Sequence, residues 1–284
     1  MWLPLPLLAV LLSVPATTWP EGDEVIGASG AHRIRRGESL IEIARRYDLG
    51  FGEIAAANPR LDAFVPPPGE LAILPTAWIL PSAAEEGTVV VNLSEMRLYY
   101  LPAGPGPLLT FPVGVAVEAG ATPLGVLTVE QKLVSPSWYP TPAIRREDPE
   151  LPAAVPPGPD NPLGSHALRL SAPTLLIHGT NRPYGVGRRV SHGCIRLYPE
   201  DIPRLHRAVR LGTPVAIVRE PVKVGVRAGR VLVEVHRDDD AAADPAELAQ
   251  RLLRARGVLE QVDPRKLERA LAARSGMPVD VSAE

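Results

Sequence analysis

The residues most able to do chemistry are gathered in one stretch, Leu175 to Leu197, which reads LLIHGTNRPYGVGRRVSHGCIRL. It holds the only cysteine of the chain, Cys194, and two of its six histidines, His178 and His192. A free thiol has a pKa of about 8.5, so at pH 7 it is mostly protonated, and only the thiolate attacks a carbonyl. A histidine within hydrogen-bond reach can take the thiol proton, so this pattern indicates nucleophilic acyl transfer.

The residues beside Cys194 fit the same chemistry. Gly193 lets the backbone approach a substrate closely and aim N–H groups at it. Such donors form an oxyanion hole, in which each is worth about 3–4 kcal/mol. If the segment is extended, Arg196 shares a face with Cys194. Its guanidinium can then pair with a carboxylate of the substrate or of the protein.

Other interpretations of these residues stay open at this point. A lone cysteine is most often a small buried hydrophobe. His178, His192 and Cys194 are also enough ligands for a catalytic zinc ion, although the chain has no His-Glu-x-x-His motif and no second cysteine. Three arginines of the intervening loop either face solvent or attract an anionic substrate: Arg182, Arg188 and Arg189. We expect a nucleophilic cysteine, no metal and no cofactor.

The elements that must position these residues are mostly strands. Runs rich in Val, Leu, Thr and Tyr, broken by Gly and Pro, predict strands at Thr88–Leu93, Arg97–Leu101, Leu108–Val117, Gly125–Val134, Ala167–Leu170, Leu175–His178 and Pro214–Val218. One helix is expected at about Pro199–Arg210. The long proline-rich stretch from Ser135 to Pro162 is expected to wall a cleft, because loops of this length are usually functional.

Residues 31–80 are expected to form a small strand–helix–helix–strand module. Ser39 and Glu42 make a capping box, and apolar residues then recur at helical spacing. A second short helix near Gly52–Ala57 should stop at Asn58, because Pro59 disfavours helical geometry in the residue before it.

Residues 221–284 are expected to form a hairpin and a helical extension. The hairpin should turn at Ala228 and Gly229. Two short helices should follow, with Pro245 and Pro264 in their first turns. Their Leu and Ala faces predict packing, and we assign them no chemistry.

Composition narrows the class of protein. The chain has 284 residues, a formal net charge of −2, 45% hydrophobic residues and 22% charged residues, which is globular and argues against wholesale nucleic-acid binding. Its 33 prolines, about 12% against a usual ~5%, predict long ordered loops. A single cysteine excludes an intrachain disulfide.

The first residues predict export. Trp2 to Val14 is apolar and uncharged, and Ala16 supplies a small residue for cleavage. We therefore expect a signal peptide over residues 1–16, a linker over 17–30 and a periplasmic protein. No later apolar run approaches 18 residues, so the mature chain should have no membrane span.

Several motifs in one order resemble a known family. His178-Gly179-Thr180 and Ser191-His192-Gly193-Cys194-Ile195-Arg196-Leu197 look like the signature of the L,D-transpeptidases, the YkuD domain, and so do Thr122-Pro123-Leu124-Gly125, Pro136-Ser137-Trp138-Tyr139 and Tyr198-Pro199-Glu200-Asp201. Arg36-Gly37-Glu38-Ser39-Leu40 and Ala57-Asn58-Pro59 resemble a LysM module, whose family binds glycans that contain N-acetylglucosamine. The combination is most similar to the ErfK/YbiS/YcfS/YnhG branch.

The resemblance implies a β-rich α+β fold, with a β-sandwich-like catalytic domain over residues 86–220. It implies that Cys194 is the nucleophile and His178 the general base, oriented by the carbonyl of Gly179. The backbone N–H groups around His192, Gly193 and Cys194 would form the oxyanion hole. The remaining residues of the motif would shape the turn or bind substrate: Ser191, His192 and Arg196, the last at a position that is Asn in other branches.

The reaction that the resemblance implies is acyl transfer between peptidoglycan stem peptides. The acceptor can be another stem, a lysine of an outer-membrane lipoprotein, or water, which would give an L,D-carboxypeptidase. The same residues would serve an amidase that cleaves lipoprotein–peptidoglycan links. A non-catalytic cell-wall binding protein is the remaining alternative. The expected partners are therefore stem peptides and glycan.

Overall fold

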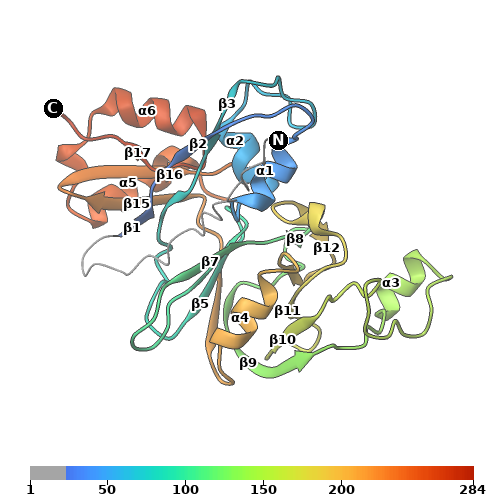
Figure 1. The fold of residues 1–284 in the computed structure, drawn as a ribbon. Coiled ribbons are helices and arrows are strands. Elements are labelled where there is room, and N and C mark those ends of the chain that lie inside the picture. The colour runs from blue at the N-terminus through green and yellow to red at the C-terminus, as the bar shows by residue number, and fades with distance from the viewer. Residues whose placement is uncertain (1–23) are drawn as a thin grey trace, which may run out of the picture.

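The structure of the protein is a computed structural model that describes residues 24–284. A small N-terminal module, a central domain and a C-terminal unit follow one another along the chain (Figure 1). Strands outnumber helices in these residues, which confirms the expected β-rich α+β class. Within the same range, no helix combines the length and the apolar character needed to cross a bilayer. The expected signal peptide, residues 1–16, lies outside the described residues.

The N-terminal module pairs four short strands around two helices. Its elements are β1 (Val25–Gly27), β2 (Gly30–Arg33), α1 (Leu40–Arg46), α2 (Phe51–Ala57), β3 (Leu71–Leu74) and β4 (Ala77–Ile79). Strand β2 pairs antiparallel with β3, and β1 with β4. The predicted capping box is present, because the Oγ of Ser39 accepts from the N–H of Glu42 and the Glu42 carboxylate accepts from the N–H of Ser39.

Residues 17–30 are expected to be a linker, but their described part, residues 24–30, contains strand structure. Val25–Gly27 form β1, and β2 begins at Gly30. The side chains of Val25 and Ile26 are buried, so this strand gains apolar contacts that a linker would not make. Local composition could not reveal this, because the partner strand β4 lies far along the chain.

The central domain is built on one eight-stranded sheet in the order β13-β11-β10-β9-β14-β5-β6-β7. Its elements are β5 (Val89–Asn92), β6 (Arg97–Tyr100), β7 (Leu109–Pro112), β9 (Gly125–Val134), β10 (His166–Leu170), β11 (Leu176–His178), β13 (Ile195–Arg196), α4 (Ile202–Ala208) and β14 (Pro214–Val218). Helix α4 packs next to β10 (Figure 1). It is shorter than the expected Pro199–Arg210, because Tyr198 to Asp201 form a turn.

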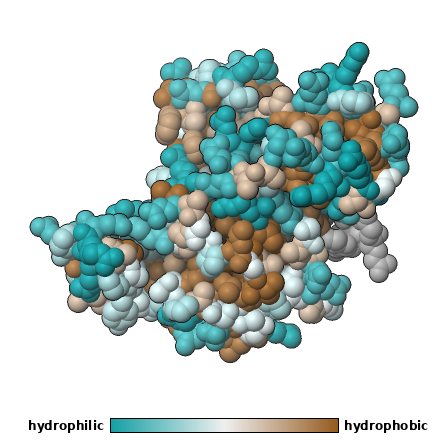
Figure 2. All heavy atoms as spheres, turned by 180° about the vertical axis from the view of Figure 1, so that it is seen from behind, coloured by the Kyte–Doolittle hydropathy of each residue, from teal (hydrophilic) through white to brown (hydrophobic). Residues whose placement is uncertain are grey.

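A second, two-stranded sheet leads into the cysteine motif. Strand β8 (Val115–Ala116) pairs parallel with β12 (Arg189–Ser191), and a short 3-10 helix, η1 (Pro183–Gly185), precedes β12. Large apolar side chains on the central domain's surface include Val117, Leu124 and Val126. In the view from behind, apolar residues gather over the middle of the molecule (Figure 2).

The proline-rich stretch from Ser135 to Pro162 is an arm that carries α3 (Pro142–Glu147) and projects from the body (Figure 1). Trp138 and Val155 exchange two backbone hydrogen bonds at its base. The buried Asn161 amide donates to three backbone carbonyls there, which fixes the arm's root.

The C-terminal unit packs two helices on a three-stranded sheet. Its elements are β15 (Val222–Arg227), β16 (Arg230–Val235), α5 (Pro245–Ala255), the 3-10 helix η2 (Leu259–Gln261), α6 (Pro264–Ala273) and β17 (Val279–Asp280). The hairpin turns at Ala228 and Gly229, as predicted, and both have positive φ, the requirement of a tight type I′ turn. Prolines start both helices, after the caps Asp244 and Asp263.

Candidate active site

The candidate site is built on two neighbouring parallel strands, β11 and β13. Ile177 pairs with Ile195, and His178 with Arg196. Both isoleucines are fully buried in the core. Side chains alternate across a strand, so His178 and Arg196 face the opposite side. Cys194 directly precedes Ile195, and the charge of Arg196 acts on both this thiol and His178. The pairing thus brings together three of the residues singled out in the sequence.

His178 is held as a neutral base. Its side chain is 4% exposed, and Nδ1 lies 2.6 Å from the carbonyl oxygen of Gly179. A carbonyl can only accept, so Nδ1 carries the proton and Nε2 remains a proton acceptor. Burial, and secondly the charge of Arg196, lower the pKa of His178 to about 4. The imidazole is therefore neutral at pH 7.

Cys194 is half-buried and mostly protonated. Its Sγ lies 3.4 Å from the carbonyl oxygen of Thr174, to which the thiol donates. Burial raises the pKa of the thiol, while the backbone N–H of Leu176 and the charge of Arg196 act in the opposite direction. Because the thiol predominates at pH 7, attack by this sulfur requires a base.

The turn between β12 and β13 is fixed by two hydroxyl groups. The Oγ of Ser191 donates to the carbonyl of Cys194 at 2.5 Å and accepts from the N–H of Gly193 at 3.3 Å. On the other side, Oγ1 of Thr122 donates to the carbonyl of Gly193 at 2.7 Å. Gly193 has φ +133°, and a Cβ there would lie 2.9 Å from the carbonyl oxygen of Ala121. This turn therefore requires glycine.

The backbone donors of the turn are not equivalent. The N–H of Gly193 points to Ser191, whereas the N–H groups of His192 and Cys194 make no hydrogen bond within residues 24–284. Backbone donors without a protein acceptor are the kind that can receive a developing oxyanion.

The side chain of His192 does not join His178 and Cys194. It is 53% exposed, and its Nε2 lies 2.8 Å from Oε2 of Glu147, the last residue of α3. The proline-rich arm therefore touches the cysteine motif, in line with its expected place beside the site. Any part that His192 plays in an oxyanion hole must come from its backbone.

Arg196 brings an unpaired positive charge to the site. Its Nε is buried without a hydrogen-bond partner, and its guanidinium forms no ion pair within the described chain. Its charge acts on both His178 and Cys194. Burial, together with the charge of Arg182, lowers the pKa of Arg196. A guanidinium of this kind is suited to a carboxylate.

Sequence reasoning missed three contacts of the site. Thr122 stands in one of the motifs that carry the family resemblance, so a signal for it existed. Thr174 contacts the thiol through its backbone carbonyl, and any residue type could do the same. Glu147 lies in the arm, where nothing in the local sequence marks it as the partner of His192.

The zinc site considered for His178, His192 and Cys194 finds no support, because His192 turns to Glu147. Within residues 24–284, the one group of three potential metal ligands that lies close together is Glu95, Glu234 and His236. The ammonium of Lys223 lies 2.6 Å from Glu95 and 2.8 Å from Glu234, so a cation of the chain itself already contacts both carboxylates.

Comparison with known proteins places the chain in a family. The model of the L,D-transpeptidase catalytic domain (YkuD) matches residues 86–217, and that of the LysM domain matches residues 32–69. Probable L,D-transpeptidase YcfS of Escherichia coli is 40% identical over 96% of this chain and 91% of its own. Probable L,D-transpeptidase ErfK/SrfK of E. coli is 38% identical over 97% of this chain and 92% of its own. Among solved structures, an L,D-transpeptidase from Mycobacterium smegmatis matches with 23% identity and a TM-score of 0.37, covering 46% of this chain and 57% of that chain.

The class defined by these findings is an enzyme with a YkuD catalytic domain and a LysM domain. The chain belongs to the L,D-transpeptidase family, because its relatives match it over nearly their whole length. The resemblance derived from the sequence motifs is thereby confirmed.

Proposed function

We propose that this L,D-transpeptidase acts on peptidoglycan tetrapeptide stems through a thioester on Cys194. The observation that carries the proposal is the β11–β13 pairing, which sets a neutral, buried histidine beside Arg196, two residues after the single cysteine of the chain. Family membership supports the type of reaction.

In the first step, the sulfur of Cys194 attacks the carbonyl that joins the third stem residue to the terminal D-Ala. Nε2 of His178 takes the thiol proton as the S–C bond forms. The unpaired N–H groups of the turn stabilise the oxyanion. The C–N bond then breaks, His178 gives its proton to the departing amine, and D-Ala leaves a thioester on Cys194.

In the second step, an amine accepts the acyl group. His178 removes a proton from the incoming amine, the new C–N bond forms, and the thiolate leaves and is reprotonated. A side-chain amine of a second stem would give a cross-link between third residues. A lysine of an outer-membrane lipoprotein would give a protein anchor, and water would give hydrolysis.

Arg196 is proposed to bind a carboxylate of the donor stem. The support is its unpartnered Nε and its position beside the thiol. Such a contact selects substrates whose carboxylate lies within a few ångströms of the scissile bond.

We further propose that the protein is exported to the periplasm and that its LysM module, residues 31–80, binds the glycan of the wall. The apolar segment over residues 1–16 supports export. N-terminal sequencing of the mature protein from a periplasmic fraction tests this, with an expected start near Thr17. A mature chain that retains Met1 in the cytoplasm would contradict it.

The reaction is tested by intact-protein mass spectrometry after mixing the mature protein with disaccharide-tetrapeptide. We expect an adduct of the donor minus D-Ala, present in the wild type and absent from Cys194→Ala, whose fold should be nearly unchanged. His178→Ala should slow acylation by about 10²–10⁴, the usual share of general acid–base catalysis. The soluble products then identify water or a second stem as the acceptor.

Two outcomes would overturn the proposal. A folded wild-type protein that forms no adduct and releases no D-Ala would favour a binding protein or an amidase. Adduct formation by Cys194→Ala would remove the nucleophile assignment.

A further inference from the structure

The loop before the cysteine motif is held from two sides by parts of the chain outside the catalytic domain. Strand β12 runs from Arg189 to Ser191, whose hydroxyl fixes the turn of Gly193 and Cys194. Along one edge, β12 pairs with β8, and the N–H of Val117, directly after β8, donates to the carbonyl of Ser191 at 2.9 Å. Displacement of β12 would therefore move the nucleophile.

The C-terminal unit holds β12 through the side chain of Arg189. Its Nη2 lies 3.1 Å from Oδ1 of Asp238, and its Nη1 lies 2.5 Å from Oδ2 of Asp240. The side chain of Asp238 is buried and also accepts from Ser94 at 2.7 Å and from Arg219 at 2.8 Å. Burial acts to raise the pKa of Asp238, but hydrogen bonds from Ser94 and from the backbone of Asp240, with the charge of Arg219, keep it below its ordinary value, so the carboxylate is charged.

The N-terminal module holds the preceding residues by close backbone packing. The N–H of Gly52 donates to the carbonyl of Gly187 at 3.1 Å. A Cβ on Gly187 would lie 2.3 Å from the backbone nitrogen of Phe51. The guanidinium of Arg188 stacks on the ring of Phe51, with its carbon 3.8 Å from the ring centroid.

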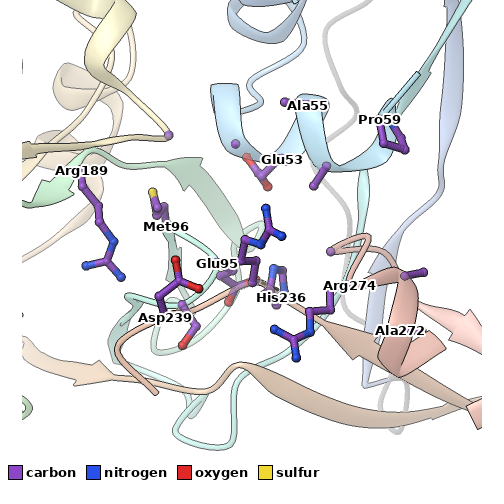
Figure 3. A pocket seen from close by; sticks show the side chains of 17 residues that line it. Glu53, Ala55, Pro59, Glu95, Met96, Arg189, His236, Asp239, Ala272 and Arg274 are labelled. Carbon is purple, nitrogen blue, oxygen red and sulfur yellow. Dashed lines mark ion pairs between the residues drawn. The ribbon is translucent and has the colours of Figure 1, made fainter. Parts of the chain in front are cut away.

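Between these two attachments lies a cavity of about 570 Å³. Its walls come from α2, from the β5–β6 turn and from the C-terminal unit, and Gly187 and Arg189 line it as well (Figure 3). In this view Arg189 extends toward the segment that carries Asp239. At the edge of this space, the Arg189 ion pairs link β12 to the C-terminal unit.

We propose that Arg189 is a positioning residue of the active site, which Asp238 and Asp240 of the C-terminal unit hold in place so that β12 sets the turn of Cys194. This assigns to residues 221–284 a part in the geometry of catalysis. The proposal rests on the proposed acyl transfer at Cys194.

The first test compares Arg189→Ala with the wild type in single-turnover acylation by disaccharide-tetrapeptide. We expect the acylation rate constant to fall about 10–100-fold, since a displacement of about 1 Å at a reacting group costs this much. The KM for the donor should change less than about threefold, because Arg189 does not touch substrate in this assignment. Arg189→Lys keeps one charged contact and should recover part of the rate.

The matched control is Arg230→Ala. Like Arg189, Arg230 forms an ion pair with an aspartate of the C-terminal unit, Asp280 at 2.8 Å, but both of these side chains are about half exposed and neither touches β12. Its acylation rate should equal that of the wild type. An equal loss in both variants would overturn the proposal, since it would indicate general destabilisation of the unit.

A second readout separates this proposal from the acyl-transfer reaction itself. Cys194 is the only thiol of the chain, so its alkylation by iodoacetamide is unambiguous. A loosened turn exposes the thiol, and exposure lowers its pKa, so Arg189→Ala should be alkylated at least about threefold faster at pH 7 while its donor acylation slows. A wild type that takes no acyl group would refute the proposed function, and the alkylation rates would still decide the positioning role.

Asp240→Asn covers the case in which Arg189→Ala does not fold. Asp240 is 25% exposed, so its replacement is tolerated more easily than that of buried Asp238. We expect Asp240→Asn to slow acylation and to speed alkylation as well, each by about the cube root of the factor expected for Arg189→Ala. If Arg189→Ala or Asp240→Asn folds and shows the acylation and alkylation rates of the wild type, the proposal is overturned.

Discussion

The N-terminal module and the C-terminal unit both pack on the catalytic domain, and they do so by different chemistry. The module shares its hydrophobic core with the catalytic domain: Tyr99, Leu101 and Leu108 of that domain lie in one apolar cluster with side chains of α1, α2 and β3. One buried ion pair, Arg97 with Glu53 at 2.7 Å, accompanies this shared core.

The C-terminal unit has a core of its own. Its buried apolar cluster contains residues between 222 and 281 and none from the catalytic domain. The unit is attached to the catalytic domain through buried charged groups instead, while its strand β15 also packs against β1 and β4 of the N-terminal module. Lys223 lies between Glu95 of the β5–β6 turn and Glu234, and its ammonium also donates to the carbonyl of Ile79 at 2.6 Å.

This difference determines which part can be separated from the rest. Removal of the N-terminal module would leave three large apolar side chains of the catalytic domain in water, so the module is an integral part of the enzyme's fold. The C-terminal unit should keep its own structure when its attachment is broken, because its core does not depend on a neighbour.

The largest effect is expected from Lys223→Met. The substitution leaves Glu95 and Glu234 buried without their counter-ion, and breaking a buried pair in this way costs about 3–5 kcal/mol. We expect urea denaturation to show that loss, and limited proteolysis to cut near Pro221 and release an intact C-terminal fragment. Arg230→Met, at the exposed pair with Asp280, should cost less than about 1 kcal/mol. Simultaneous digestion of fragment and enzyme would contradict the idea of an independent unit.

Leu101→Ala tests the shared core. Leu101 is buried in the cluster of the N-terminal module, and its truncation should cost about 2–3 kcal/mol. Hydrogen exchange should rise in α1 and α2 as well as in β6. The matched variant is Leu253→Ala, which removes the same atoms from the core of the C-terminal unit. In Leu253→Ala, hydrogen exchange should rise only within residues 222–281. A rise in α1 as well would show that the two attachments do not differ.

A smaller effect is expected from Gly187→Ala, which disturbs the contact between the N-terminal module and the loop before the active site. The new methyl group would meet the backbone of Phe51, and overpacking of this kind costs about 1–3 kcal/mol. Gly212→Ala is the control, because Gly212 has a similar positive φ but no atom within 4 Å of its Cβ position. The difference in free energy of unfolding between the two variants measures the contact alone. Equal losses would show that the contact contributes nothing.

The sequence predicted those features that depend on residues close together in the chain. The capping box of Ser39, the hairpin turn at Ala228 and the strand that carries His178 each follow from neighbours in the chain. The attachments could not be predicted in this way. Arg189 looks like any solvated arginine until folding brings Asp238 to it, 49 residues further on. Glu147 and His192 are 45 residues apart.

The same limit applies to the shared core. The apolar face of the N-terminal module is visible in the sequence, but the periodicity of a helix does not reveal which strand of another domain will cover it. The sequence therefore predicted most of the elements that carry the candidate site, and the roles of its residues stay a prediction. It did not predict that two accessory units hold the loop before the nucleophile.

The last effect depends on pH and concerns a carboxyl group at the attachment of the N-terminal module. Asp201 is fully buried, its Oδ2 has no partner, and its Oδ1 lies 3.1 Å from Nη1 of Arg204, which also contacts Asp48 of the module. Burial, and then the negative charge of Asp48, raise the pKa of Asp201 to about 8. In the unfolded chain an aspartate has a pKa of about 3.9. Between these values the native state holds a proton that the unfolded state has lost.

Stability must therefore decline as the pH rises from about 4 to about 8, and the decline should level off above the folded pKa. Asp201→Asn keeps the site neutral at every pH, so its free energy of unfolding should fall less over this range than that of the wild type. Asp239→Asn, at an exposed aspartate, should leave the slope unchanged. Urea denaturation at several pH values measures all three slopes. If Asp201→Asn keeps the wild-type slope of unfolding free energy against pH, a group other than Asp201 holds the proton. The attachment of the N-terminal module would then not depend on pH.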